Sequence, residues 1–179
     1  MQKVALIIAN KEFRDEEYTT IKDILISKGI KIYTFSNETG LALGRFGNEV
    51  EVKNNIKDLN VKNFDAIVFI GGSGALDYLN NDISYNLARS FLDNNKIVGA
   101  ICISPVILAE SGILKGKSAT VWSSPMDKSA IAILKKNMAK FNDLAVVVDG
   151  NIVTGRNCEA SPEFALAIFS LLTNCQKSI

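Results

Sequence analysis

The chain has 179 residues, of which 47% are hydrophobic and 22% charged, with 20 Lys and Arg against 19 Asp and Glu. This length suits a single domain over residues 1–179 with a sizeable core, and the balanced charge argues against a nucleic-acid-binding or membrane-binding surface. The chain contains no histidine, so the usual general base of Ser-His-Asp and Cys-His enzymes is missing. The three cysteines are widely spaced. They indicate a reducing cytoplasmic setting, and without histidine they argue against a zinc site, so we expect no metal and no cofactor.

Continuous apolar runs alternate with amphipathic stretches, a pattern typical of a parallel sheet covered by helices. In chain order we predict a strand at 4–9, a helix at 16–28, a strand at 30–35, short edge strands near 50–52, a strand at 65–70, a helix at 83–94, a strand at 97–101, a short helix ending at Gly112, a strand at 118–122, a helix at 128–141, a hairpin of 144–148 with 152–154, and a helix at 160–172. Ser104 and Pro105 are the residue types of a helix N-cap and first helical position. The expected fold is a three-layer α/β sandwich.

Three loops follow strands of this predicted sheet and should therefore lie along its carboxyl edge. They are residues 10–17, which are rich in acidic side chains, residues 71–74, which read Gly-Gly-Ser-Gly, and the turn that carries Cys102. Ser73 and Ser104 add hydroxyl groups as candidate pocket residues. The edge of the sheet thus combines carboxyl groups, open backbone N–H groups and a thiol.

Each of these parts has a chemical use. A tight strand-to-helix turn strains Cys102 and lifts its side chain from the sheet, and the following helix start favours a thiolate. Glycine at 72 and 74 lets backbone N–H groups point at an anion, and these groups, with the N–H of Ile103, are suited to stabilising an oxyanion. A carboxylic acid kept protonated by burial could donate a hydrogen bond to the sulfur and shuttle a proton.

A structural interpretation exists for each feature taken alone. A cysteine after an apolar strand is most often a small buried hydrophobic residue. Glycines after a strand usually mark only a tight turn, and the acidic cluster of residues 15–17 is favoured by the dipole of the helix it begins. The chemical interpretation gains its weight from the convergence of all three.

The combination resembles the ThiJ/PfpI superfamily, in particular the branch that contains the parkinsonism-associated deglycase. The stretches that carry the resemblance are Phe-Arg-Asp-Glu-Glu at 13–17, Asp-Ala-Ile-Val-Phe-Ile-Gly-Gly-Ser-Gly at 65–74, Gly-Ala-Ile-Cys-Ile-Ser-Pro at 99–105, Leu-Lys-Gly-Lys-Ser-Ala-Thr at 114–120, Asp-Gly-Asn-Ile-Val-Thr-Gly-Arg at 149–156 and Pro-Glu-Phe-Ala-Leu-Ala-Ile at 162–168. They follow the family's order over almost the whole chain.

The resemblance implies a flavodoxin-like fold, mostly parallel, that usually forms homodimers. It implies that Cys102 is the nucleophile of the elbow, that Glu17 is the glutamic acid in contact with it, and that Gly72 and Ile103 provide the oxyanion amides. If Glu17 is the wrong carboxylate, Glu16, Glu12 and Asp15 are next in line.

The chain also departs from the family. The protease-like members have a histidine directly after the nucleophile, where this chain has Ile103, and the glyoxalase-type branch often has one near the position of Ser124. A Cys-His-Glu protease triad therefore cannot form. Arg156 and Cys158 fall in a loop that borders the nucleophile pocket in this family. Cys158 is either an ordinary loop thiol or the partner of an oxidised Cys102 in a disulfide.

Three functions remain open at this point. The first is an enzyme in which the Cys102 thiolate adds to a small electrophile. The resemblance suggests reactive carbonyls, with hydration of methylglyoxal to lactate or release of early glycation adducts, and a low rate without histidine. An isonitrile is a related possibility. The second is a sensor of oxidative stress whose output is oxidised Cys102, and the third is a chaperone-like scaffold that needs no Cys102.

Overall fold

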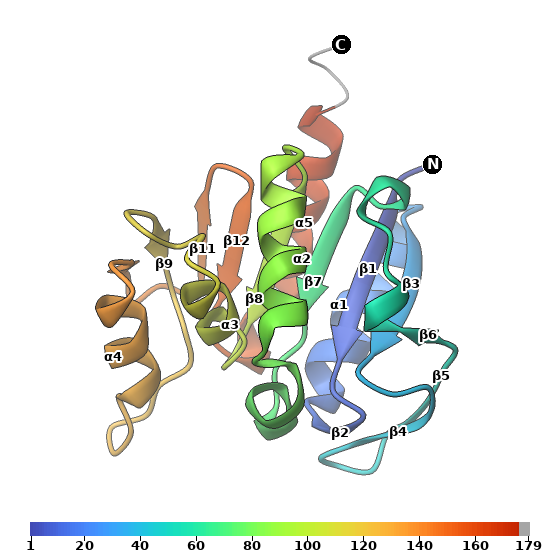
Figure 1. Ribbon diagram of the computed structural model, residues 1–179, viewed down its shortest axis with the longest axis horizontal. Helices are drawn as coiled ribbons and strands as arrows, with labels where there is room; N and C mark the ends of the chain where they lie inside the picture. Colours follow the sequence, from blue (N-terminus) through green and yellow to red (C-terminus); the bar gives the residue numbers. More distant parts are fainter. Residues whose placement is uncertain (176–179) are drawn as a thin grey trace.

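The protein, described here from a computed structural model over residues 1–175, is built around a seven-stranded sheet with the order β11-β12-β8-β7-β1-β3-β6 (Figure 1). Its strands are β1 (Lys3–Ile8), β3 (Lys31–Ser36), β6 (Asn54–Asn55), β7 (Ala66–Phe69), β8 (Ile97–Ile101), β11 (Val146–Asp149) and β12 (Ile152–Gly155). Neighbouring strands are parallel, except that β11 and β12 form an antiparallel hairpin. The predicted hairpin and mostly parallel sheet are confirmed.

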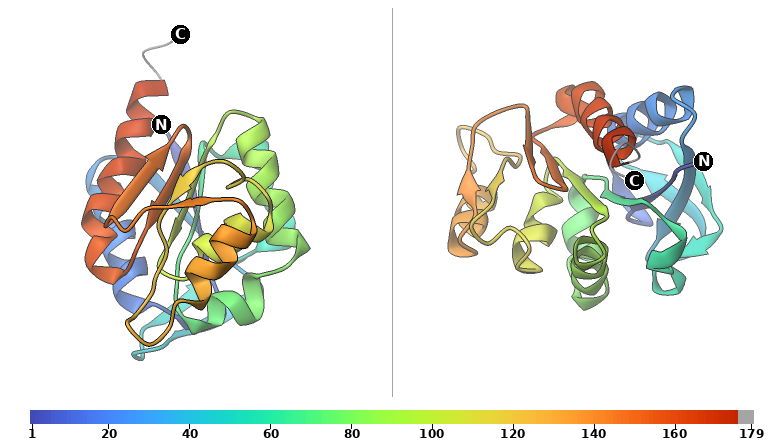
Figure 2. Two further views of the ribbon diagram at one scale, coloured as in Figure 1. Left: turned by 90° about the vertical axis from the view of Figure 1, so that its left-hand side faces the viewer. Right: turned by 90° about the horizontal axis from the view of Figure 1, so that it is seen from above.

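Helices cover both faces of the sheet. Figure 2 shows α1 (Asp15–Ser27) and α5 (Ser161–Cys175) on one face, with α2 (Asp82–Asp93) and α3 (Pro105–Glu110) on the other. A further helix, α4 (Ser129–Lys136), packs against α3. The predicted three-layer α/β sandwich is therefore confirmed.

The central strand β1 shows why the sheet is buried on both sides. Because successive side chains of a strand point to opposite faces, Leu6 and Ile8 join the core beneath α1 and α5. Ala5 and Ile7 join the second core, on the α2 and α3 side. All four side chains are fully buried, so the apolar run of this strand packs against two helical layers.

A small second sheet lies beside the carboxyl edge of the main one. It has the order β2-β4-β5 and consists of β2 (Lys11–Phe13), β4 (Gly40–Gly44) and β5 (Glu49–Val52). The edge strand expected near residues 50–52 is β5, whereas β2 and β4 were not predicted. Strand β2 directly precedes α1, so this sheet positions the loop that leads to the acidic cluster.

Two predicted elements near the hairpin were too long. The helix expected at 128–141 ends at Lys136, because Met138 adopts a left-handed backbone with φ 62° that a helix does not continue through. Residues Lys140–Phe141 (β10) then pair with Ser118–Ala119 (β9) in a separate parallel pair. The strand expected at 118–122 stops at β9, since the next amide, Thr120 N, donates to the Thr154 hydroxyl at 2.9 Å.

Candidate active site

The chain order of the strands places the site beside β1. After β1 the chain adds β3 on one side and later β7 and β8 on the other, and such a reversal opens a crevice at the carboxyl ends of the strands. The loops after β1, β7 and β8 meet there. They bring together Glu17, the Gly71–Gly72 turn and Cys102, as the sequence predicted.

Cys102 follows β8 in a strained backbone conformation. Its φ is 62°, in the left-handed region that non-glycine residues rarely adopt. The strain is held by hydrogen bonds on both sides: Cys102 N donates to Gly155 O at 2.9 Å, and Cys102 O accepts from Trp122 N at 2.8 Å. The side chain is half-buried, as expected for a nucleophile elbow at the end of a strand.

Glu17 lies in the first turn of α1 and is fully buried. Its Oε2 accepts a hydrogen bond from Gly71 N at 2.9 Å. The Cys102 thiol interacts with the same carboxyl group, and Oε1 has no other partner among residues 1–175. Burial raises the pKa of Glu17 to about 7, against the opposing effects of the Gly71 amide and the Cys102 thiol.

The pKa of the Cys102 thiol is shifted in opposite directions by the groups around it. Burial raises its pKa, and so does the negative charge of Glu17, while the backbone N–H groups of Gly72 and Ile103 lower it. The net direction is upward, with burial as the largest cause. When Glu17 is protonated, the repelling charge is gone and the acid can donate to the sulfur instead. Because each group acts on the pKa of the other, we expect the two to titrate as a coupled pair.

Gly71 allows the Glu17 carboxyl group to reach Cys102, although no role was predicted for this glycine itself. A Cβ atom at this position would lie 2.5 Å from Cys102 Cβ and 2.7 Å from Glu17 Oε2. Only glycine fits between these two side chains. The next residue, Gly72, has φ 104°, and this left-handed backbone turns its N–H toward the sulfur.

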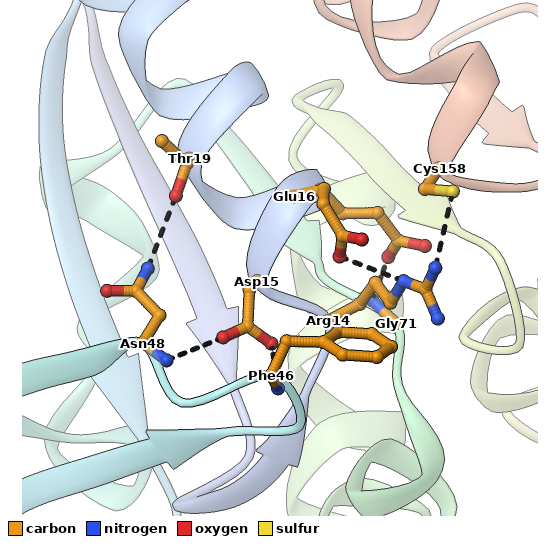
Figure 3. A network of polar contacts seen from close by, with 9 residues as sticks. Arg14, Asp15, Glu16, Thr19, Phe46, Asn48, Gly71 and Cys158 are labelled. Atoms are coloured by element: carbon orange, nitrogen blue, oxygen red, sulfur yellow. Dashed lines mark hydrogen bonds and ion pairs between the residues drawn. The ribbon is translucent and has the colours of Figure 1, made fainter.

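The other acidic residues of the cluster are engaged elsewhere (Figure 3). Asp15 accepts hydrogen bonds from Phe46 N at 2.9 Å and Asn48 N at 2.7 Å. Glu16 pairs with Arg14, with 3.0 Å between Oε2 and Nε. Glu12 is exposed and accepts from the Ser73 hydroxyl at 3.3 Å. Of the four carboxylates considered, Glu17 is the one in contact with Cys102.

Ser104 and Pro105 occupy the N-cap and first helical positions of α3, as predicted. Ser104 has helical backbone angles, however, and its side chain caps no amide of α3. Its buried hydroxyl donates instead to Ile70 O at 2.8 Å, which ties the turn after β8 to the end of β7. Helix α3 begins only at Pro105, three residues after Cys102. The backbone N–H that interacts with the sulfur is therefore that of Ile103, which precedes the helix.

A cavity of about 390 Å³ opens above Cys102. It is lined by Arg14, Arg45, Gly72, Ser73, Cys102, Ile103 and Trp122. Arg14, Arg45 and Trp122 were not among the predicted site residues. The sequence positions of Arg14, just before the acidic cluster, and of Trp122, at the end of a predicted strand, could have indicated that they lie near the site. Arg45 lies in a segment with no regular pattern, so its position gave no such indication.

Ser124 and Arg156 line a neighbouring cavity of about 300 Å³, which shares Trp122 with the first. Arg156 Nη1 pairs with Asp143 Oδ1 at 2.7 Å. Cys158 begins a short 3-10 turn and is a free thiol, as is Cys102. Its sulfur accepts from Arg14 Nη2 at 3.6 Å. The structure thus places Cys158 beside the arginine of the Cys102 cavity, and its pairing with Cys102 stays a prediction.

Within the described part of the chain, no three His, Cys, Asp or Glu side chains gather as they would around a metal ion. Over the same residues, no helix has both the length and the apolar character needed to cross a membrane.

The family model described as the DJ-1/PfpI family matches residues 2–171. The chain belongs to the DJ-1/PfpI family. An uncharacterized protein of Methanocaldococcus jannaschii is 42% identical over 171 residues, 95% of this chain and 82% of that protein. A deglycase of Pyrococcus horikoshii is 32% identical over 86% of this chain and 89% of its own length. The crystal structure of a ThiJ/PfpI domain protein from Brachyspira murdochii superposes with a TM-score of 0.90, at 32% identity, over 96% of both chains.

Proposed function

We propose that this protein is a cysteine-dependent enzyme that acts on small reactive carbonyl compounds, with Cys102 as nucleophile and Glu17 as proton shuttle. The observation that carries the proposal is the contact between the buried Glu17 carboxyl group and the strained Cys102 across Gly71. A solvated loop carboxylate would not have a pKa near 7, whereas a proton shuttle at neutral pH requires one.

The first step is addition of the thiolate to the carbonyl carbon. A carbon–sulfur bond forms, the π electrons of the C=O bond move to oxygen, and Glu17 supplies the proton that completes the hemithioacetal. The amides of Gly72 and Ile103 are positioned to stabilise the developing negative oxygen, as in other oxyanion sites. For a 2-oxoaldehyde such as methylglyoxal, the hydrogen of the hemithioacetal carbon then moves as a proton to the neighbouring carbonyl carbon, with Glu17 as its carrier, which gives a 2-hydroxy thioester on Cys102. Water attacks this thioester, the carbon–sulfur bond breaks, and the 2-hydroxy acid, lactate, leaves with the Cys102 thiol restored.

The test is consumption of methylglyoxal with formation of lactate by the purified protein. We expect slow but measurable turnover that Cys102→Ser abolishes and Glu17→Gln reduces, while Glu16→Gln, on the exposed neighbouring carboxylate, leaves it unchanged. Turnover that survives Cys102→Ser would overturn the proposal. Cleavage of peptides by a Cys-His pair is not expected, since the chain has no histidine.

A sensor of oxidative stress is the second candidate, favoured by one observation. The same Gly72 and Ile103 amides that face the sulfur would equally hold an oxygen of oxidised Cys102, and Cys158 contacts Arg14, which lines the same cavity. Peptide mapping after mild peroxide tests it. A stable oxidised Cys102, or its disulfide with Cys158, in a protein that consumes no carbonyl compound would favour the sensor.

We further propose that the protein is a cytoplasmic homodimer, as its family resemblance implies, and light scattering of the purified protein tests the dimer. The chaperone-like alternative predicts that Cys102→Ser leaves suppression of client aggregation intact.

A further inference from the structure

Two arginines face the cavity above Cys102, and no acidic side chain is part of its lining. Three carboxyl groups lie close to it without lining it. Glu17 is buried behind Gly71, Glu16 contacts Arg14 at Nε, and Glu12 accepts from the Ser73 hydroxyl at 3.3 Å. The cavity therefore presents positive charge to whatever enters it.

Arg14 is held in place by three different groups (Figure 3). Its guanidinium carbon lies 4.7 Å from the centroid of the Phe46 ring, its Nε 3.0 Å from Glu16, and its Nη2 3.6 Å from the Cys158 sulfur. Its Nη1 donates no hydrogen bond to any residue of the described chain. An arginine fixed in this way can present a donor to a ligand at little cost in side-chain entropy.

Arg45 contributes a second positive charge and, unlike Arg14, forms no ion pair with a carboxylate within residues 1–175. Its backbone N donates to Phe13 O at 2.9 Å, which fixes the start of the side chain beside the strand that leads to Arg14. The residue is also exposed. Its charge is available to a ligand.

Neither arginine is needed for the carbonyl oxygen of a substrate. Attack by Cys102 makes that oxygen negative, and the backbone N–H groups of Gly72 and Ile103 face the position of the reacting sulfur. Guanidinium groups pair well with carboxylate and phosphate. Arg14 and Arg45 are thus left for a second negative group on the same molecule.

We infer that the substrate of Cys102 is a small carbonyl compound that also carries a carboxylate or phosphate, and that Arg14 and Arg45 bind this anionic group. The inference rests on the proposed function, because it takes Cys102 to be the nucleophile. The anionic group does not react: the carbon–sulfur bond forms at the carbonyl carbon, and the proton for its oxygen comes from Glu17 as before.

Two alkylating reagents of nearly equal size test the charge preference. Iodoacetate is anionic and iodoacetamide neutral, and both transfer a two-carbon group to a thiolate with release of iodide. We expect Cys102 to prefer iodoacetate over iodoacetamide more strongly than a free thiol such as glutathione does. The ratio of the two rates should fall by about two- to fivefold in Arg45→Gln, the effect of one exposed charge.

Matched variants separate charge from structure. Arg45→Lys keeps the charge and should keep most of the preference. Lys31→Gln removes a positive charge at the opposite edge of the sheet, where Lys31 begins β3, and should leave the ratio unchanged. Raising the salt concentration should lower the ratio for the native protein, because exposed charges are screened.

Protection experiments distinguish the two anionic groups. Inorganic phosphate or acetate, added at equal ionic strength, should slow labelling of Cys102 by iodoacetamide, and the more effective anion identifies the group that the arginines bind. This protection should be lost in the double variant of Arg14→Gln and Arg45→Gln.

The outcomes keep the two proposals apart. Rapid labelling by iodoacetamide with a rate ratio that Arg45→Gln leaves unchanged would overturn the anionic substrate and leave the nucleophile standing. No labelling of Cys102 by either reagent until the protein is denatured would overturn the proposed function, and the anionic substrate with it.

Discussion

Replacing Glu17 by Gln should make the protein more stable at pH 8. Glu17 is fully buried, and its pKa rises from an ordinary 4.5 to about 7, chiefly through burial. At about 1.4 kcal/mol per pKa unit, keeping the charged form in the fold costs about 3 kcal/mol. Gln removes this cost and still offers an oxygen to the Gly71 amide.

The sign of the pH dependence follows from the raised pKa. Below pH 4.5 Glu17 is protonated in both the folded and the unfolded chain, so its ionisation costs nothing. Between 4.5 and about 7 the unfolded chain releases the proton and the folded chain holds it, so the free energy of unfolding falls as the pH rises. The full loss of about 3 kcal/mol is reached above pH 7.

Urea denaturation at pH 4.5, 6 and 8, a range set by the two pKa values, measures this directly. Glu17→Gln should match the native protein at the lowest pH and exceed it by up to about 3 kcal/mol at the highest. Glu16→Gln, on an exposed carboxylate, should differ by less than about 0.5 kcal/mol throughout. A Glu17→Gln protein that is less stable than the native one at pH 8 would refute the claim that the carboxylate facing Cys102 is destabilised by burial.

Two further predictions concern the residues around the pair. Gly71→Ala places a Cβ against Cys102 and Glu17. It should destabilise the fold by about 1–3 kcal/mol in urea denaturation and reduce the labelling rate of Cys102. An alanine variant with native stability and reactivity would show that the Cys102 and Glu17 side chains are not in contact. Asp15→Asn removes one of the two carboxylate oxygens that accept from Phe46 N and Asn48 N and should cost about 1–2 kcal/mol in urea denaturation. Full native stability of this variant would contradict the structural role given to Asp15.

The elbow was predictable because its determinants are local. The local sequence predicts a strand, a sharp turn and a helix. The signals are the apolar run of β8, the small residues Gly99 and Ala100 before the turn, and Pro105 three residues after Cys102. That the loops meet at one edge follows from parallel strands.

Other parts of the site depend on contacts that no local pattern encodes. Arg45 reaches the cavity through the pairing of β2 with β4, two strands that the sequence did not reveal. The Ser104 hydroxyl donates to Ile70 O, just after β7, although its residue type suits a helix cap. The helix predicted at 128–141 was too long, because amphipathic periodicity does not reveal a left-handed residue such as Met138.

The central claim is that Cys102 and Glu17 share one proton, and the pH dependence of iodoacetamide labelling at Cys102, followed by peptide mass spectrometry, tests it most directly. The account predicts a first rise centred near pH 7, where the pair loses its first proton, then a plateau, and a second rise at high pH when the ionised Glu17 opposes the thiolate. Glu17→Gln should collapse this to a single rise. A single rise near the ~8.5 of a free thiol, the same in both proteins, would mean that the two groups titrate independently and would contradict the account.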